Sequence, residues 1–226
     1  MGSLVVLVPA GGRGERFGAA QPKQLLSVGD RPVLQWTLGR LLELGPAWLT
    51  VALPAGVELP VQAWNLPAER VTRVDGGATR QQSVVACLAA TPGSEDDLVI
   101  VHDGARPATA REDLAAVIAA ARESGAAVLG RPISDTVKRL EAERIVATVD
   151  RRALFRAETP QVFRRDLLTR AFAAALQEGR DETDESAAVE RLGGIEIRAV
   201  YARYANPKLT FPADLARMTA LLGDRA

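Results

Sequence analysis

The sequence predicts an α/β fold: a Rossmann-like three-layer sandwich with a mainly parallel central sheet and a protruding β-hairpin arm. Three observations lead to this prediction. Short apolar runs, such as residues 4–8, have the length and composition of strands that are buried on both faces. Segments with a helical spacing of apolar residues separate these runs, as in sheets whose parallel strands are joined by right-handed crossovers. Polar, glycine-rich turns follow several of the runs, at the edge where such sheets bind ligands.

The expected elements of the first half alternate along the chain. Residues 4–8 form a strand, and residues 32–45 form a helix that Gly45 and Pro46 end. A strand at 48–53 is followed by an irregular or short-helical connection at 54–67 and a short strand at 70–74. A glycine turn then opens a helix at 80–90, and the buried strand at 98–101 leads into a polar turn at 102–107. A helix with an alanine-rich face at 112–124 and a strand at 126–129 follow.

The segment 133–150 interrupts this alternation. Two short β-type runs, 136–140 and 145–149, flank a charged turn and predict a β-hairpin. The hairpin has few large apolar side chains with which to form its own core, so we expect an arm that embraces a second subunit. A surface hairpin without a partner is the alternative. No linker or repeat divides the chain, which predicts a single domain over 1–226 with the arm at about 133–151.

The remaining elements return to the α/β pattern. We expect a strand at 161–163, a helix at 165–178 and a further helix that begins within 181–186. Thr183 is the predicted N-cap of that helix, because a threonine followed by acidic residues is typical of a helix start. A strand at 195–200, a loop or edge strand at 206–210 and a closing helix at 212–222 complete the chain.

Composition narrows the classes of function. Apolar residues make up 47% of the 226 residues, and 28 basic residues balance 28 acidic ones, which argues against a nucleic-acid coat or a membrane-surface protein. Cys87 is the single cysteine, so an intramolecular disulfide is excluded. No apolar stretch predicts a signal peptide or a membrane span, and we therefore expect a cytoplasmic protein. His102 is the single histidine, which excludes multi-histidine metal sites.

The stretch 4–23 carries the strongest functional signal. After the first strand come Gly11, Gly12 and Gly14, whose missing Cβ atoms let a ligand reach the backbone amides. Basic residues at 13, 16 and 23 add positive charge, so the stretch predicts a polyphosphate-binding loop. It fits neither a dinucleotide fingerprint, because Phe17 occupies the third glycine position, nor a nucleoside-triphosphatase loop, because it has no Gly-Lys pair. A glycine-rich turn that binds nothing is the alternative.

The glycine loop and the later motifs together resemble a known family. The order G-G-x-G-x-R…P-K at 11–23 is similar to the signature loop of nucleotidyltransferases that join a nucleoside triphosphate to a sugar or alcohol phosphate. Further matching segments follow in order over nearly the whole chain: GGATRQQSV (76–84), VHDGARP (101–107), SDTVK (134–138), TVDR (148–151), TPQ (159–161), TDES (183–186) and NPKLT (206–210). As a set they resemble the 2-C-methyl-D-erythritol 4-phosphate cytidylyltransferases. The resemblance implies a Mg²⁺-dependent homodimer that uses CTP and a small polyol phosphate, without a nucleic-acid or membrane partner.

The resemblance also implies a role for each matching residue. The catalytic cations are Arg16, Lys23, Arg151 and Lys208. The nucleotide contacts are Ala10, Gly11, Gly12, Gly14, Gly77, Ala78, Ser83 and Gly104. The contacts to the alcohol phosphate are Asp103, Arg106, Thr136 and Thr183, and the arm brings Thr136 and Arg151 to the neighbouring subunit's site. Mg²⁺ is expected to be held largely by the triphosphate, with Asp103 as the protein candidate for a direct or water-mediated ligand.

Several alternatives stay open at this point. A cytidylyltransferase for another polyol phosphate, such as ribitol 5-phosphate, would share the fold and most of the motifs. A non-catalytic nucleotide-binding domain would be expected to lose Arg16 or Lys23, and both are present. A nicotinamide-dependent oxidoreductase is disfavoured by Phe17. Asp103 and Arg106 have a simpler interpretation as a structural ion pair, and Arg151 as a surface arginine.

Overall fold

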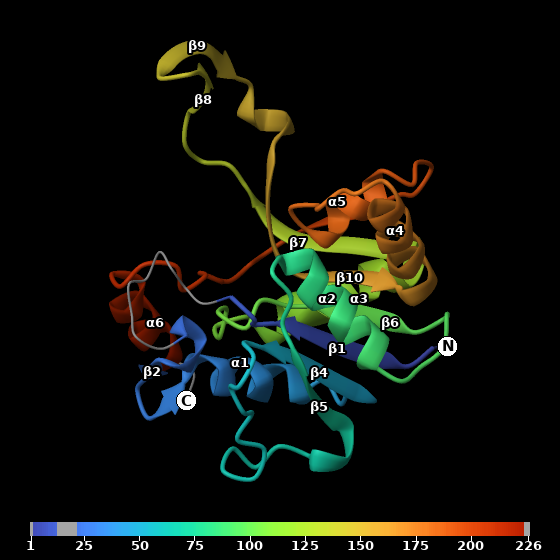
Figure 1. Cartoon of the computed structure of the whole chain (residues 1–226). Helices are drawn as coiled ribbons and strands as arrows, with labels where there is room; N and C mark the ends of the chain where they lie inside the picture. Colours follow the sequence, from blue (N-terminus) through green and yellow to red (C-terminus); the bar gives the residue numbers. More distant parts are fainter. Residues whose placement is uncertain (1, 13–21, 224–226) are drawn as a thin grey trace.

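The computed structural model describes residues 2–12 and 22–223, and a seven-stranded sheet forms its centre (Figure 1). From one edge to the other, the strands are β11 (Arg198–Tyr201), β7 (Ala126–Pro132), β10 (Phe155–Arg164), β6 (Leu98–Val101), β1 (Leu4–Pro9), β4 (Trp48–Leu53) and β5 (Val71–Asp75). All neighbouring strands are parallel except β10, which runs antiparallel to both β6 and β7. The mainly parallel sheet predicted from the sequence is confirmed.

Helices cover both faces of this sheet. On one face, α1 (Val33–Leu42) and α3 (Arg111–Ser124) pack against a core that includes Val6 and Val8 of β1. On the other face, α2 (Arg80–Ala90), α4 (Arg165–Gln177) and α5 (Glu185–Glu190) pack against a core that includes Val5 and Leu7. The side chains of β1 thus alternate between two buried cores, which explains its uninterrupted apolar sequence. This arrangement confirms the three layers.

The C-terminal helix closes one side of the molecule. A third apolar cluster joins α6 (Asp214–Gly223) to the first residue of α1 and to a small hairpin, β2 (Ser27–Val28) with β3 (Arg31–Pro32). Leu209 and Met218 are fully buried in it. The loop before α6 is thereby held beside the carboxyl ends of the central strands. No helix within 2–12 and 22–223 combines the length and the apolar character needed to cross a membrane.

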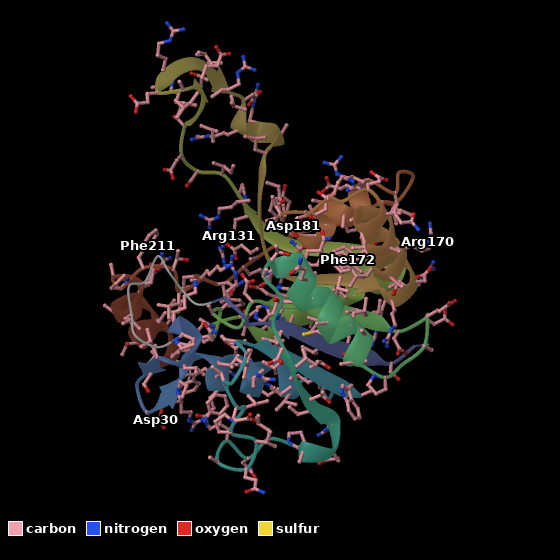
Figure 2. All side chains as sticks on the ribbon, viewed as in Figure 1. Asp30, Arg131, Arg170, Phe172, Asp181 and Phe211 are labelled. Carbon is pink, nitrogen blue, oxygen red and sulfur yellow. The ribbon has the colours of Figure 1, made fainter. Side chains whose placement is uncertain are left out.

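The predicted arm is present as a hairpin of its own. Strands β8 (Val137–Glu141) and β9 (Arg144–Val149) form a separate two-stranded sheet that extends away from the body of the molecule (Figure 1). Figure 2 shows side chains projecting from the arm into its surroundings. The apolar side chains of Leu140 and Ile145 are 57% and 65% exposed. A short 3₁₀ turn, η4 (Arg151–Ala153), leads back to β10.

Strand β11 begins at Arg198 and not at residue 195, and β7 extends to Pro132 and not to residue 129. Larger differences from the sequence prediction occur at three other elements. Strand β10 is ten residues long, whereas 161–163 was expected, because a register shift between Ala157 and Gln161 interrupts its alternating pattern. Helix α5 begins at Glu185, and its N-cap is Asp184, which accepts a hydrogen bond from the amide of Ala187. The prediction of Thr183 as the N-cap is therefore wrong. The β2–β3 hairpin was not predicted, since its strands are too short to show a period.

Candidate functional site

A cleft of about 820 Å³ opens at the carboxyl ends of β1, β4, β5 and β6. Turns that are far apart in the sequence line it: 10–12 after β1, 54–55 after β4, 76–80 after β5 and 103–105 after β6. Lys23, Gln24, Ser83, Lys208 and Thr210 complete its lining. Three of the polar turns that the sequence predicted after the strands, those after β1, β5 and β6, therefore meet in one cleft, where parallel sheets bind ligands.

Glycine allows the first two turns to touch. A Cβ atom on Gly11 would lie only 2.9 Å from the Cα atom of Gly76 and 3.2 Å from Ser83 Oγ. A Cβ atom on Gly104 would lie 2.9 Å from the Cβ atom of Ala10. The backbone of the three turns is consequently packed at a spacing that larger residues do not permit.

Gln24 fastens the first turn to the structure that follows it. Its buried side-chain amide donates to the carbonyl of Ala10 and lies 3.4 Å from the carbonyl oxygen of Gly12. The sequence analysis missed this residue, because a glutamine beside a proposed phosphate loop carries no charge that would draw attention. These two contacts restrain the backbone of the turn at Ala10 and Gly12.

The turn after β5 caps helix α2 and points the start of that helix at the cleft. Thr79 is the N-cap, and its hydroxyl accepts from the amide of Gln82. Ser83 Oγ accepts from the amide of Gly77 at 3.1 Å and donates to the carbonyl of Thr79 at 3.0 Å. Ala78 donates its amide to the side chain of Gln82. These bonds make the turn rigid, and the positive end of the helix dipole favours a negatively charged ligand.

The carboxylate of Asp103 lies at the centre of the charged part of the cleft. Arg80 donates to its Oδ1 atom, while Lys208 Nζ and Arg106 Nε lie 2.9 Å and 3.2 Å from its Oδ2 atom. Burial works to raise the pKa of Asp103, but the charges of Arg80, Lys208 and Arg106 hold that pKa well below its ordinary value. Asp103 is therefore ionised at neutral pH, and three cations from different parts of the chain meet at one carboxylate.

A buried hydrogen-bond network positions the loop that carries Lys208. The side-chain amide of Asn206 donates to the carbonyl of Thr159 at 2.8 Å and to Glu158 Oε2 at 3.2 Å, and its Oδ1 atom accepts from Thr109 at 2.8 Å. The backbone carbonyl of Asn206 accepts from Arg106 at 2.6 Å. Asn206 is 2% exposed, so these partners replace the water that the amide loses on burial.

His102 belongs to this network and not to the cleft. Its Nε2 atom lies 3.0 Å from the hydroxyl of Thr109, and the residue is 1% exposed. Burial lowers the pKa of His102 to about 3, so the ring is neutral at physiological pH. His102 is therefore a structural residue beside the site. Cys87 is likewise a fully buried core residue, and burial raises the pKa of its thiol to about 12.

Most of the residues that the sequence singled out line the cleft: Ala10, Gly11, Gly12, Lys23, Gly77, Ala78, Ser83, Asp103, Gly104 and Lys208. Arg106 joins them through its ion pair with Asp103, as its simpler interpretation also predicted. Gly14 and Arg16 lie outside the described residues. Thr136, Arg151 and Thr183 are not among the described residues that line the cleft: Thr136 and Arg151 lie near the two ends of the arm, and Thr183 precedes α5.

The sequence analysis also missed Arg80 and Glu185. Arg80 lies in the first turn of α2 and ties Asp103 to Glu185 of α5, at 2.9 Å from Glu185 Oε2. A basic residue directly after a helix N-cap, where the helix dipole disfavours it, was the available signal. Burial raises the pKa of Glu185, and the guanidinium of Arg80 opposes this.

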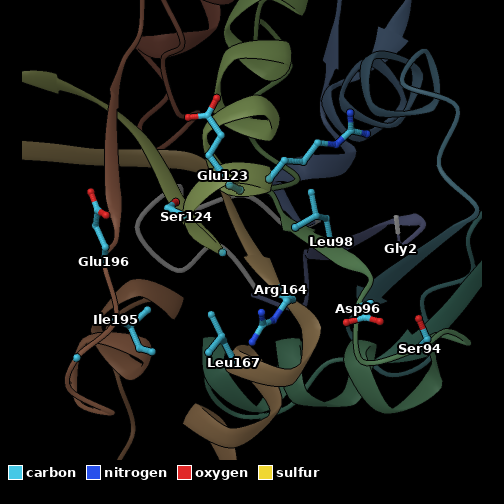
Figure 3. A pocket seen from close by; sticks show the side chains of 14 residues that line it. Gly2, Ser94, Asp96, Leu98, Glu123, Ser124, Arg164, Leu167, Ile195 and Glu196 are labelled. Carbon is cyan, nitrogen blue, oxygen red and sulfur yellow. The ribbon is translucent and has the colours of Figure 1, made fainter.

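A second cavity of about 740 Å³ lies at the other ends of the strands, beside the amino ends of β6 and β7. Figure 3 shows the residues that line it. Its lining mixes acidic side chains such as Asp96, Glu123 and Glu196 with Arg122 and Arg164. None of the predicted functional residues that the structure describes lies in it. The first cleft is therefore the candidate site, since it alone of these two cavities combines the glycine turns, the start of a long helix and a cluster of cations.

Comparison with known proteins agrees with this geometry. The model of the 2-C-methyl-D-erythritol 4-phosphate cytidylyltransferase family matches residues 4–224. The chain belongs to this family. A 2-C-methyl-D-erythritol 4-phosphate cytidylyltransferase of Chromobacterium violaceum is 42% identical over 228 residues, which cover 98% of this chain and 99% of the relative. Another, of Chromohalobacter salexigens, is 43% identical over 234 residues, which cover 100% of this chain and 92% of the relative.

Solved structures give the same result. The crystal structure of the cytidylyltransferase from Thermus thermophilus superposes with a TM-score of 0.82 at 37% identity, over 98% of this chain and 99% of that chain. The 4-diphosphocytidyl-2C-methyl-D-erythritol synthase from Anaerococcus prevotii superposes with a TM-score of 0.83 at 26% identity, over 98% of both chains. Members of the family thus share the α/β fold, including its mainly parallel sheet.

Proposed function

We propose that the protein transfers the cytidylyl group of CTP to 2-C-methyl-D-erythritol 4-phosphate, which gives CDP-methylerythritol and pyrophosphate for isoprenoid biosynthesis. Membership of the family supports this activity. The observation that carries it in the structure is the cleft itself, in which rigid glycine turns adjoin the three cations around Asp103. Such a site is suited to holding two phosphate-bearing molecules next to each other.

The reaction needs positioned charge more than it needs a proton shuttle. An oxygen of the alcohol phosphate attacks the α-phosphorus of CTP, a new P–O bond forms, and the bond to pyrophosphate breaks. The second pKa of a phosphate monoester is about 6, so the nucleophile is already mostly a dianion at neutral pH. The protein therefore has to bring two anions together and stabilise the charge that develops on the transferred group and on the leaving group. The buried, neutral His102 is consistent with a mechanism without a histidine base.

The nucleotide half of the site is assigned to the glycine turns. We propose that the backbone of Ala10, Gly11, Gly12 and Gly14 binds the nucleotide, that Gly77, Ala78 and Ser83 face the base, and that Gly104 lies nearby. Arg16 and Lys23 are assigned to the triphosphate. The place of Lys23, Gly77 and Ser83 in the lining of one cleft supports this assignment. The stiffness of the turn around Ser83 supports a base pocket that is formed before the ligand binds.

The alcohol-phosphate half is assigned to the charged cluster. We propose that Asp103, Arg106 and Thr183 bind this substrate and that Lys208 stabilises the charge of the reacting phosphate. The 2.9 Å contact of Lys208 with Asp103 within the cleft supports a common task. Thr136 and Arg151 are proposed to act on the neighbouring subunit's substrate in a homodimer. The extension of the arm away from its own body, with exposed apolar side chains, supports that arrangement.

Mg²⁺ is proposed as the metal ion of the reaction. No cluster of three histidine, cysteine, aspartate or glutamate side chains that could hold a metal occurs in the described part of the chain. Asp103 lines the cleft, but both of its carboxylate oxygens already face cations. This favours the triphosphate as the main holder of Mg²⁺, with Asp103 at most a partner through water. When bound, the ion would neutralise charge that builds up on the phosphate oxygens.

Two broader proposals accompany the activity. We propose that the described elements and the arm belong to one domain over 1–226, which the single sheet with helices on both faces supports. We also propose a cytoplasmic location, in keeping with a single, fully buried cysteine.

A substrate panel tests the proposed function directly. The protein is supplied with Mg²⁺, each of CTP, UTP, GTP and ATP, and either 2-C-methyl-D-erythritol 4-phosphate or ribitol 5-phosphate, and pyrophosphate release is measured. We expect the fastest release with CTP and 2-C-methyl-D-erythritol 4-phosphate. Preferred use of ribitol 5-phosphate would refute the assigned acceptor but keep the reaction class. Absence of release with every pair would refute the reaction class itself.

A further inference from the structure

Arg80 connects two buried carboxylates that come from different elements. One of its Nη atoms donates to Asp103 Oδ1, and the other lies 2.9 Å from Glu185 Oε2 in α5. The side chains of Asp103 and Glu185 are only 7% and 1% exposed. A buried carboxylate without a partner is strongly destabilising, and the guanidinium of Arg80 helps to compensate both of these carboxylates. Burial works to lower the pKa of Arg80, but the two carboxylates raise it above its ordinary value, so the guanidinium stays charged.

The two neighbours of Arg80, Thr79 and Gln81, bind the loop that precedes Glu185. Thr79 Oγ1 donates to Asp181 Oδ1 at 2.7 Å, and Figure 2 labels Asp181 in the loop before α5. Gln81 donates its side-chain amide to the carbonyl of Arg180 at 3.0 Å and accepts from the amide of Glu182 at 2.8 Å. The start of α2 and the segment 180–185 are therefore joined by contacts from Thr79, Arg80 and Gln81.

The two carboxylate oxygens of Asp103 contact different cations. Lys208 and Arg106 approach Oδ2, whereas Arg80 approaches Oδ1. The orientation of the carboxylate thus depends on the ion pair with Arg80 at one oxygen and on the ion pairs with Lys208 and Arg106 at the other. Glu185 in turn restrains Arg80, because it occupies the second Nη atom and stops the guanidinium from turning fully toward Asp103.

We propose that Arg80 is a positioning residue for the alcohol-phosphate half of the site. It holds the carboxylate of Asp103 in the orientation that receives the alcohol phosphate, and Glu185 holds Arg80 in the place from which it does so. This inference rests on the proposed function, because it assigns Asp103 to that substrate. The guanidinium of Arg80 forms ion pairs with two carboxylates, so we assign Arg80 a role through Asp103 and not on the reacting phosphates.

Steady-state kinetics with each substrate varied in turn test the inference. The wild-type protein is measured first with CTP, Mg²⁺ and 2-C-methyl-D-erythritol 4-phosphate, and its turnover tests the proposed function separately. For Arg80→Gln we expect kcat/KM for the alcohol phosphate to fall about tenfold or more, with the KM for CTP within about threefold of wild type. Arg80→Lys keeps the charge but reaches only one carboxylate, so it should recover part of the loss. Equal changes in both KM values, or no change, would overturn the inference.

A double-mutant cycle separates positioning from simple stabilisation of the fold. If Glu185 acts through Arg80, then Glu185→Gln raises the KM for the alcohol phosphate on its own but adds nothing to Arg80→Gln. Effects that multiply in the double variant would overturn the inference. Arg165→Gln is the matched control, because Arg165 also pairs with a buried carboxylate, Asp97, but contacts the carbonyl of Leu88 at the other end of the sheet. It should lower thermal stability without changing either KM.

The inference can still be tested if the Arg80→Gln variant does not fold. If Arg80→Gln gives no folded protein, Arg80→Lys and Glu185→Gln carry the test, since one keeps the charge and the other the shape of the residue that it replaces. Both should then raise the KM for the alcohol phosphate more than the KM for CTP. The inference is overturned if both leave the KM for the alcohol phosphate within about twofold of wild type.

Discussion

Acidification should destabilise the protein through His102. The ordinary pKa of histidine, 6.5, applies to the unfolded chain, whereas burial lowers the pKa of His102 to about 3 in the folded protein. Between these values the unfolded chain binds a proton that the native state refuses, so stability falls as the pH falls below 6.5. From 6.5 to pH 5 the difference is 1.5 pKa units, or about 2 kcal/mol at 1.36 kcal/mol per unit. Because pH 5 is well above 3, this magnitude depends on the unfolded value and little on the native one.

Urea unfolding at pH 7 and pH 5 measures this effect, with His102→Asn as the reference. The asparagine keeps a polar group beside Thr109 but has no proton to gain. We expect the wild-type free energy of unfolding to drop by about 2 kcal/mol more than that of the variant over this range. Glu185 works in the opposite direction, because burial raises its pKa and acid then relieves a cost in the native state. That contribution is common to both proteins and cancels. Equal drops in the two proteins would refute the burial argument for His102.

Three further predictions concern the site. Asn206→Ala removes one hydrogen bond each from Thr109, Glu158 and the carbonyl of Thr159, so unfolding by urea should show a loss of about 3 kcal/mol, and activity should fall through Lys208; a loss below about 1 kcal/mol would contradict the network. Gly11→Ala places a Cβ atom 2.9 Å from the Cα atom of Gly76, so calorimetric titration should show weaker CTP binding, while Gly39→Ala in α1, outside the cleft and with open space around its Cβ position, gives a matched comparison; equal affinities would contradict the packing of the turns. Arg151→Ala should raise the KM for the alcohol phosphate more than that for CTP, and a fully active monomer in sedimentation would show that the arm does not complete the site.

The fold could be predicted because its signals are local and periodic. The run at β1 is apolar at every position since both faces are buried, and α1 and α2 end or begin at glycine, proline or threonine residues that have clear meanings. The full length of β10 could not be predicted, since Glu158, Thr159 and Pro160 interrupt the apolar pattern in the middle of the strand. Glu158 and Thr159 form hydrogen bonds with residues that are distant in the sequence, and no local pattern reveals these contacts.

The site could be predicted where a residue type has one dominant use. Glycines after a buried strand and a lysine or arginine near them indicate phosphate binding, and the cleft contains Gly11, Gly12 and Lys23 as expected. Arg80 and Glu185 could not be predicted as a pair, because 105 positions separate them in the sequence and only the folded chain brings them together. Asn206 was noted as part of a motif, but its role in holding Lys208 depends on partners in β10 and on Thr109.

The two feet of the arm are neighbours in the central sheet. Strand β7 leads into the arm and β10 leads out of it, and Pro132 pairs with Phe155 where the two strands part. The sheet is therefore already closed by backbone pairing below the point where the arm departs. The arm is a separate two-stranded sheet. We therefore expect that residues can be added or removed at the turn between β8 and β9 without altering the register of any strand that forms the cleft. The length of the arm, and hence its distance to a bound partner, can therefore vary with little effect on the stability of the central sheet.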